Sequence, residues 1–126
     1  MSGRNYRDGR MLRNPYNQNV RLWFDMAILA IITGAGNTTK DAYEKLRKEV
    51  DWEHRQPPGG IFHAASVDNS GNIHVADVWE SEEQLNSFFK DRLKPAMQKF
   101  NIPEPRVEVF QIHNVDAFPG LDKYKV

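Results

Sequence analysis

The sequence predicts an α+β domain in which a four-stranded antiparallel sheet carries two helices on one face. Short apolar runs, partly β-branched, alternate with segments whose apolar residues recur at helical spacing. Their order along the chain is strand, helix, strand, strand, helix, strand. With 126 residues, 40% of them hydrophobic, the chain has the size and composition of one globular domain.

The first strand is expected at residues 26–33, a continuous apolar run that ends at glycines. Such a run is typical of a central strand that is covered on both faces. Thr38 is the candidate cap of the helix that follows. Leu46 and Val50 lie on the apolar face of that helix, whereas its charged residues, Arg47 among them, are expected to face water.

The middle of the chain predicts a hairpin. Residues 61–67 and 73–79 have the composition of strands, and residues 68–72 between them are rich in turn formers.

The second helix is expected to begin after Ser81, because the sequence Ser-Glu-Glu-Gln at this point is a capping box. Pro95 lies inside the apolar stripe of this helix and lacks a backbone N–H, so the helix should kink or split near Lys94. Residues 106–113 alternate in hydropathy and predict the last strand.

This order of elements fits the ferredoxin-like arrangement, because right-handed crossovers leave few other ways to connect it. The predicted domain spans residues 26–118. Residues 1–25 are expected to form a flexible arm with five arginines and two aspartates, and residues 119–126 a C-terminal tail.

The hairpin also predicts which side chains share a face. If its strands pair symmetrically about the turn, His63 lies opposite Asp77 and Ile61 lies opposite Trp79. Both faces of the hairpin are then largely apolar, although two helices cover only one face of the sheet. We therefore expect a homodimer that forms through the open sheet face, the alternative being a monomer with a large open cleft.

His63 and Asp77 are the candidate catalytic residues. A carboxylate beside an imidazole holds it in one tautomer, which suits a general base. Trp79, Val75 and Ile61 are expected to line a pocket for a small molecule.

His113, at the end of the last strand, is within possible reach of the same pocket. The alternative for the His63 and Asp77 pair is a buried hydrogen bond with a structural role only.

Several classes of site are disfavoured. The chain has no cysteine, and its four histidines show no metal-ligand spacing, so neither a metal site nor a cofactor is expected. No apolar run is long enough to span a membrane, and no signal peptide opens the sequence, so a cytoplasmic protein is expected. The net formal charge is zero; the arginines of the arm alone favour contact with nucleic acid, and that contact would be weak.

Three segments carry a family resemblance: residues 59–65 (GGIFHAA), 77–83 (DVWESEE) and 110–115 (FQIHNV). They resemble dimeric α/β-barrel proteins, and among these the small antibiotic biosynthesis monooxygenase-like proteins. The resemblance implies that two ferredoxin-like subunits pack sheet to sheet, with a pocket between sheet and helices in each. It also implies that Trp79 lines the pocket and that Val75 stands where oxygenating members have asparagine.

Two hypotheses on function follow. The first is a cofactor-independent monooxygenase, or a related enzyme, that acts on a small aromatic or unsaturated metabolite with His63 as base. The second is a non-catalytic module that binds a small molecule or a protein partner.

Overall fold

The computed structural model describes residues 6–7, 10–11, 26–36 and 38–126. The predicted arm of residues 1–25 lies outside the described residues except for two short strands that pair with each other. The elements, in chain order, are β1 (Tyr6–Arg7), β2 (Arg10–Met11), β3 (Ile28–Thr33), α1 (Lys40–Glu49), β4 (Gly60–Val67), β5 (Ile73–Trp79), α2 (Glu82–Phe88), η2 (Phe89–Leu93), α3 (Lys94–Lys99), β6 (Arg106–Gln111) and η3 (Pro119–Tyr124).

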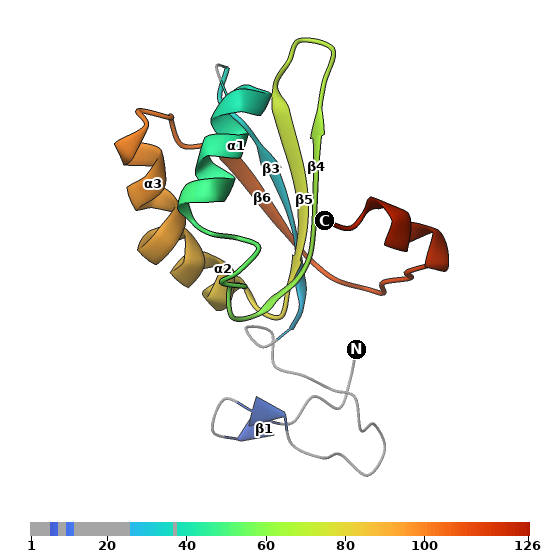
Figure 1. Ribbon diagram of the computed structural model, residues 1–126. Coiled ribbons are helices and arrows are strands. Elements are labelled where there is room, and N and C mark those ends of the chain that lie inside the picture. The colour runs from blue at the N-terminus through green and yellow to red at the C-terminus, as the bar shows by residue number, and fades with distance from the viewer. Residues whose placement is uncertain (1–5, 8–9, 12–25, 37) are drawn as a thin grey trace.

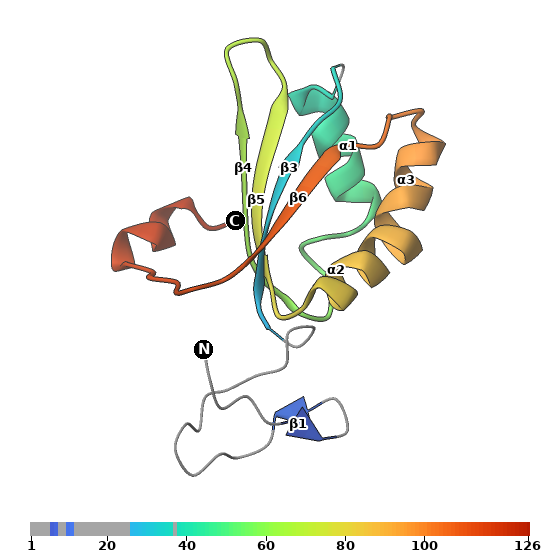
Figure 2. The ribbon, with the colours of Figure 1, turned by 180° about the vertical axis from the view of Figure 1, so that it is seen from behind.

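The main sheet has the strand order β4-β5-β3-β6, and all of its neighbouring strands are antiparallel. The helices α1, α2 and α3 lie on one side of this sheet, as Figures 1 and 2 show from opposite directions. The C-terminal segment with η3 lies on the other side. The predicted ferredoxin-like α+β fold is confirmed.

The core fills the space between the sheet and the helices. Trp79 is its largest fully buried side chain, with 1% of its surface exposed. The other buried members of the core come from β3, α1, α2, α3 and the turn that follows α1, and they are Ile28, Ala30, Leu46, Val50, Leu85, Phe88, Ala96 and Met97.

Helix α1 is capped one residue later than predicted. Thr39, not Thr38, is the cap: its backbone is extended and its hydroxyl accepts the N–H of Ala42 at 3.3 Å. Thr38 is instead buried beside Gly34, and its hydroxyl makes no hydrogen bond to the helix.

The second helical segment begins as predicted, since the Ser81 hydroxyl accepts the N–H of Gln84 at 3.2 Å. The interruption predicted near Lys94 is also present. It takes the form of the π-helical turn η2, at whose end the N–H of Lys94 donates to the carbonyl of Phe89. A wider turn absorbs the hydrogen bond that Pro95 is unable to donate, so the chain continues as a helix.

The hairpin pairs His63 with Asp77, as predicted. The predicted pairing of Ile61 with Trp79 is wrong: Gly60 lies opposite Trp79, and a bulge between Gly60 and Phe62 shifts the register. A bulge inserts one extra residue into one strand, and a symmetric pairing scheme does not foresee this.

Candidate functional site

A buried carboxylate and a histidine face each other on the helix side of the sheet. His63 projects from β4 and Asp77 from β5, and the distance from His63 Nδ1 to Asp77 Oδ1 is 2.7 Å. Asp77 is buried, with 4% of its surface exposed. Its other oxygen, Oδ2, accepts the indole N–H of Trp79 at 3.1 Å. Trp79 thereby fixes the orientation of the carboxylate.

Tyr43, from α1, extends this hydrogen-bonded chain. Its hydroxyl lies 2.6 Å from His63 Nε2, and the two rings are nearly parallel, with an interplanar angle of 3°. An ionised carboxylate only accepts hydrogen bonds, so Asp77 requires a proton on His63 Nδ1. In a neutral ring Nε2 is then the acceptor, and Tyr43 donates to it.

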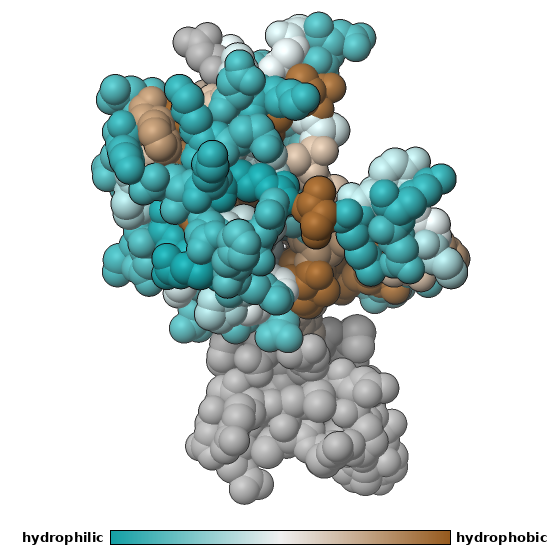
Figure 3. All heavy atoms as spheres, viewed as in Figure 1, coloured by the Kyte–Doolittle hydropathy of each residue, from teal (hydrophilic) through white to brown (hydrophobic). Residues whose placement is uncertain are grey.

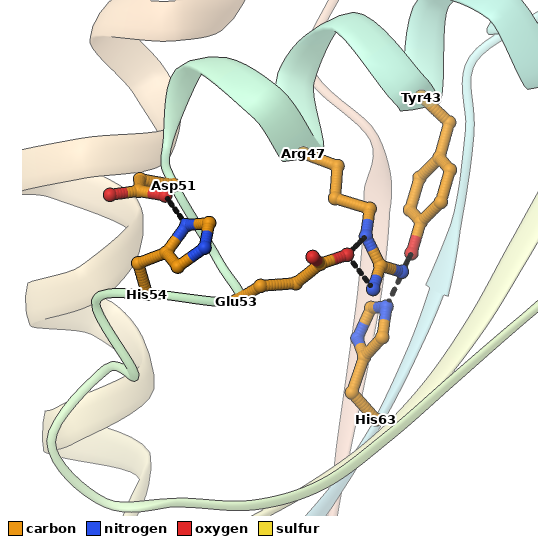
Figure 4. Close-up of polar contacts among 6 residues, drawn as sticks. All are labelled: Tyr43, Arg47, Asp51, Glu53, His54 and His63. Atoms are coloured by element: carbon orange, nitrogen blue, oxygen red, sulfur yellow. Dashed lines mark hydrogen bonds and ion pairs between the residues drawn. The ribbon is translucent and has the colours of Figure 1, made fainter. Parts of the chain in front are cut away.

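Arg47 lies one helical turn after Tyr43 and approaches the same hydroxyl. Arg47 Nη1 donates to Tyr43 Oη at 3.5 Å, while Nε and Nη2 donate to Glu53 Oε1 at 3.2 and 2.9 Å (Figure 4). Burial raises the pKa of the Tyr43 phenol, and the hydrogen bond from Arg47 acts in the opposite direction. The prediction that Arg47 faces water is wrong: its side chain is 18% exposed.

Trp52 covers His63 from the loop that follows α1. The ring centroids of Trp52 and His63 are 4.6 Å apart, and Trp52 also meets the ring of Phe88 edge-on at 5.3 Å. Asp51 adopts a left-handed backbone conformation (φ 55°), which turns the chain sharply before Trp52. Arg92 holds this loop by donating from Nη2 to the carbonyls of Val50 and Arg55.

A cavity of about 100 Å³ lies against this group of side chains. Tyr43, Arg47, His63, Asp77 and Thr38 are the polar residues that line it. Most of the remaining lining is apolar, for example Ile32, Leu46, Val50, Val75, Met97 and Ile102. A mostly apolar cavity with a few polar groups is the usual form of a small-molecule site.

A second hollow, more open and larger at about 520 Å³, lies between α2 and the strands β3 and β6. Its lining includes Glu82, Glu83, Asn86 and Lys90, all of them exposed. It contains no buried titratable group among the described residues, so we place the candidate site at the smaller cavity.

The predicted site residues divide into two groups. His63, Asp77 and Val75 line the cavity. Trp79 does not, because it is enclosed in the core and acts on the site through Asp77. Ile61 (54% exposed) and His113, which is also exposed, are not among the lining residues.

The sequence pattern does not single out Tyr43, Arg47 or Trp52 as site residues. The spacing of Tyr43 and Arg47, four residues apart on one helix, places both on the same face. That spacing was the available signal, but it has the same form in many solvated helices. Trp52 follows the helix in a loop, and in a loop the hydropathy pattern does not indicate where a side chain points.

Among the described residues, no group of three or more His, Cys, Asp or Glu side chains is placed to hold a metal ion. In the same part of the chain, no helix is long and apolar enough to cross a membrane.

The sequence matches no protein-family model and no curated protein. Solved structures match by fold. SnoaB, a cofactor-independent oxygenase from Streptomyces nogalater, gives a TM-score of 0.56 at 8% identity over 71% of this chain and 96% of that chain.

Two further structures are similar. A candidate antibiotic biosynthesis monooxygenase from Caulobacter crescentus gives a TM-score of 0.54 at 15% identity, over 72% of this chain and 93% of that chain. A conserved protein from Methanosarcina mazei gives a TM-score of 0.52 at 16% identity, over 71% of this chain and 98% of that chain. The chain therefore has the ferredoxin-like α+β fold that antibiotic biosynthesis monooxygenase-like proteins share.

Proposed function

We propose that the protein is an enzyme that removes a proton from a small aromatic or unsaturated metabolite, whose carbanion then reacts with O₂. The observation that carries this proposal is the hydrogen-bonded chain from Asp77 through His63 to Tyr43 at the wall of a mostly apolar cavity. The fold it shares with a cofactor-independent oxygenase gives further support.

Tyr43 is the group of this chain that meets the substrate. Both nitrogens of His63 already have partners, so a phenolic or enolic hydroxyl in the cavity approaches the Tyr43 oxygen first. As Tyr43 takes the proton of the substrate, it passes its own proton to His63 Nε2. The imidazolium that forms lies 2.7 Å from the carboxylate of Asp77, which stabilises it.

The oxidation balances with O₂ as the oxidant. The deprotonated phenol or enol is conjugated, so part of its negative charge lies on a carbon that still carries one hydrogen, and a carbon–oxygen bond to O₂ forms there. The peroxide takes back the proton held on the relay and loses water, which leaves a carbonyl group. One oxygen atom of O₂ therefore enters the product, and the other leaves in water with the former hydroxyl proton and the hydrogen of that carbon. Arg47 and the Tyr43 hydroxyl are the polar groups near the developing anion.

A second candidate is a non-catalytic protein that binds a small molecule. One observation favours it: both ring nitrogens of His63 and both carboxylate oxygens of Asp77 have a protein partner, as in a purely structural network. The two candidates differ in turnover and agree on the place of binding.

The test uses candidate phenols and enols with isotopically labelled O₂, and mass spectrometry detects the label in the product. Tyr43→Phe and His63→Gln should each lower turnover at least about 100-fold. Tyr124→Phe is the matched control, because Tyr124 is 73% exposed and lies in the C-terminal segment. Full turnover in both site variants would refute the proton relay, and binding without any labelled product would favour the non-catalytic protein.

We further propose that the open face of the sheet pairs with a second copy of the chain. Phe62, Val78, Leu29 and Phe110 lie side by side across the four strands and point away from the helices. Phe62 is 38% exposed and Phe110 is 52% exposed. Hydrophobic surface is also visible next to the C-terminal segment (Figure 3).

A further inference from the structure

Thr38 carries a buried hydroxyl without a partner. The residue is 7% exposed, and its Oγ1 is one of two buried side-chain polar atoms without a hydrogen bond in the described part of the chain. The other is Arg92 Nε, whose guanidinium still donates to two carbonyls through Nη2. Buried hydroxyls in native proteins nearly always have a partner, so this one calls for an explanation.

Thr38 is held firmly at one end of the cavity. Its carbonyl accepts the N–H of Ile73 at 3.1 Å, and Ile73 in turn accepts the N–H of Gly34 at 2.9 Å. A Cβ atom on Gly34 would lie 2.7 Å from the Cβ of Thr38, so Thr38 fits at this position only because residue 34 is a glycine. Thr38 and Gly34 both line the cavity.

The cavity is thus polar at two separate places. Thr38 lies beside Ile73 at the start of β5, and Asp77 follows four residues later, about 13 Å away along the strand. Val75, between them, faces the same cavity and is apolar. Tyr43 and His63 belong to the Asp77 end.

We propose that Thr38 binds a second polar group of the ligand, opposite the group that meets Tyr43. The inference rests on the proposed function for the Tyr43 end. The ligand is then a flat molecule with a hydroxyl or carbonyl group at each end and an apolar middle. A cavity of roughly 150 Å³ accepts benzene, so one of about 100 Å³ has room for at most one ring.

Hydroquinone and para-cresol are suitable probes, because each has one ring with one hydroxyl. At the opposite ring position hydroquinone has a second hydroxyl, whereas para-cresol has a methyl group. Binding is measured by calorimetry without O₂, so that no turnover interferes. Wild-type protein should bind hydroquinone about threefold to tenfold more tightly than para-cresol, the range expected for one hydrogen bond.

Thr38→Val keeps the shape and removes the hydroxyl, so it should abolish this preference, whereas Thr38→Ser should retain it. Thr33→Val is the matched control: Thr33 ends β3, pairs with His74 and Arg106, and faces away from the helices. It should leave the preference unchanged.

The outcomes separate this inference from the proposed function. If both probes bind equally and Tyr43→Phe weakens both, the site stands and the role of Thr38 is refuted. A preference that persists in Thr38→Val refutes it as well. If neither probe binds the wild-type protein at millimolar concentration, the single-ring site itself is wrong.

Discussion

His63 has a hydrogen-bond partner at each ring nitrogen, so in the proposed mechanism Tyr43, and not His63, takes the proton of the substrate. The sequence predicts His63 as the base, whereas the structure places it in the middle of a hydrogen-bonded chain that ends at the Tyr43 hydroxyl. Asp77 determines which nitrogen of His63 carries the proton, and the indole N–H of Trp79 orients the Asp77 carboxylate. Arg47 donates a hydrogen bond to the Tyr43 hydroxyl. In the proposed mechanism, Tyr43 is therefore the group that meets the substrate.

The Tyr43 phenol should titrate above its ordinary pKa of about 10. Burial, the largest cause, raises this pKa, and Arg47 opposes the rise. The near-ultraviolet phenolate absorbance of the wild-type protein minus that of Tyr43→Phe should therefore show a midpoint above pH 10. Arg47→Met should move it higher still, and a midpoint at or below 10 would contradict the buried position of the phenol.

The same shift has a consequence for stability. The folded state holds the Tyr43 proton more tightly than the unfolded state does. The contribution of this proton to the free energy of unfolding is thus complete below about pH 10 and is lost as the pH rises through the pKa of the folded protein.

The sequence alone predicts the pairing of His63 with Asp77, because strand alternation and a five-residue turn determine which side chains lie opposite each other. It does not predict Tyr43 and Arg47 as partners. Their contact with the sheet depends on how α1 rotates about its own axis as it packs, and local sequence does not encode that angle. For the same reason, the sequence pattern predicts that Arg47 faces water, although its side chain is 18% exposed.

The loop between α1 and β4 is held to the second helical segment by Arg92. Its guanidinium donates to the carbonyls of Val50 and Arg55 and lies 5.1 Å from the centroid of the Phe88 ring. The π-helical turn η2 contains Arg92, so the element that accommodates Pro95 also orients the residue that positions Trp52 and its loop.

Arg92→Leu should lower the free energy of unfolding by about 1–3 kcal/mol, because it leaves two carbonyls without their donor. Urea denaturation followed by tryptophan fluorescence measures this change. Lys45→Leu serves as the control: Lys45 is exposed on α1, and its replacement should change the value by less than about 0.5 kcal/mol. An equal effect in the two variants would show that Arg92 does not anchor the loop.

The sequence predicts the positions of helices and strands more accurately than it predicts irregularities within them. The predicted strand at residues 73–79 matches β5, and the cap at Ser81 is confirmed. The bulge at Gly60 and the π-helical turn before Pro95 could not be foreseen, because each depends on how neighbouring elements pack.

The open face of the sheet changes in polarity along its strands. The row that contains Phe62 and Phe110 is wholly apolar, while the row at the opposite end contains Ser66, His74 and Arg106. Helices α1, α2 and α3 lie on the other side of the sheet with the core and the cavity, and among the described residues only the C-terminal segment with η3 lies on the side of this face. A second copy that packs onto the apolar half would remove Phe62 and Phe110 from water and leave the polar half at its rim.

The pairing of two copies predicts a specific loss on mutation. Wild-type protein should sediment as two chains at micromolar concentration, and Phe110→Asp should weaken the association at least about 100-fold, because it buries an unpaired charge twice in a symmetric interface. Gln98→Asp introduces the same charge at an exposed position of α3, on the far side of the sheet, and should remain associated. Circular dichroism establishes that both variants are folded. A wild-type protein that sediments as one chain, or a Phe110→Asp variant that stays paired, would refute an interface on this face.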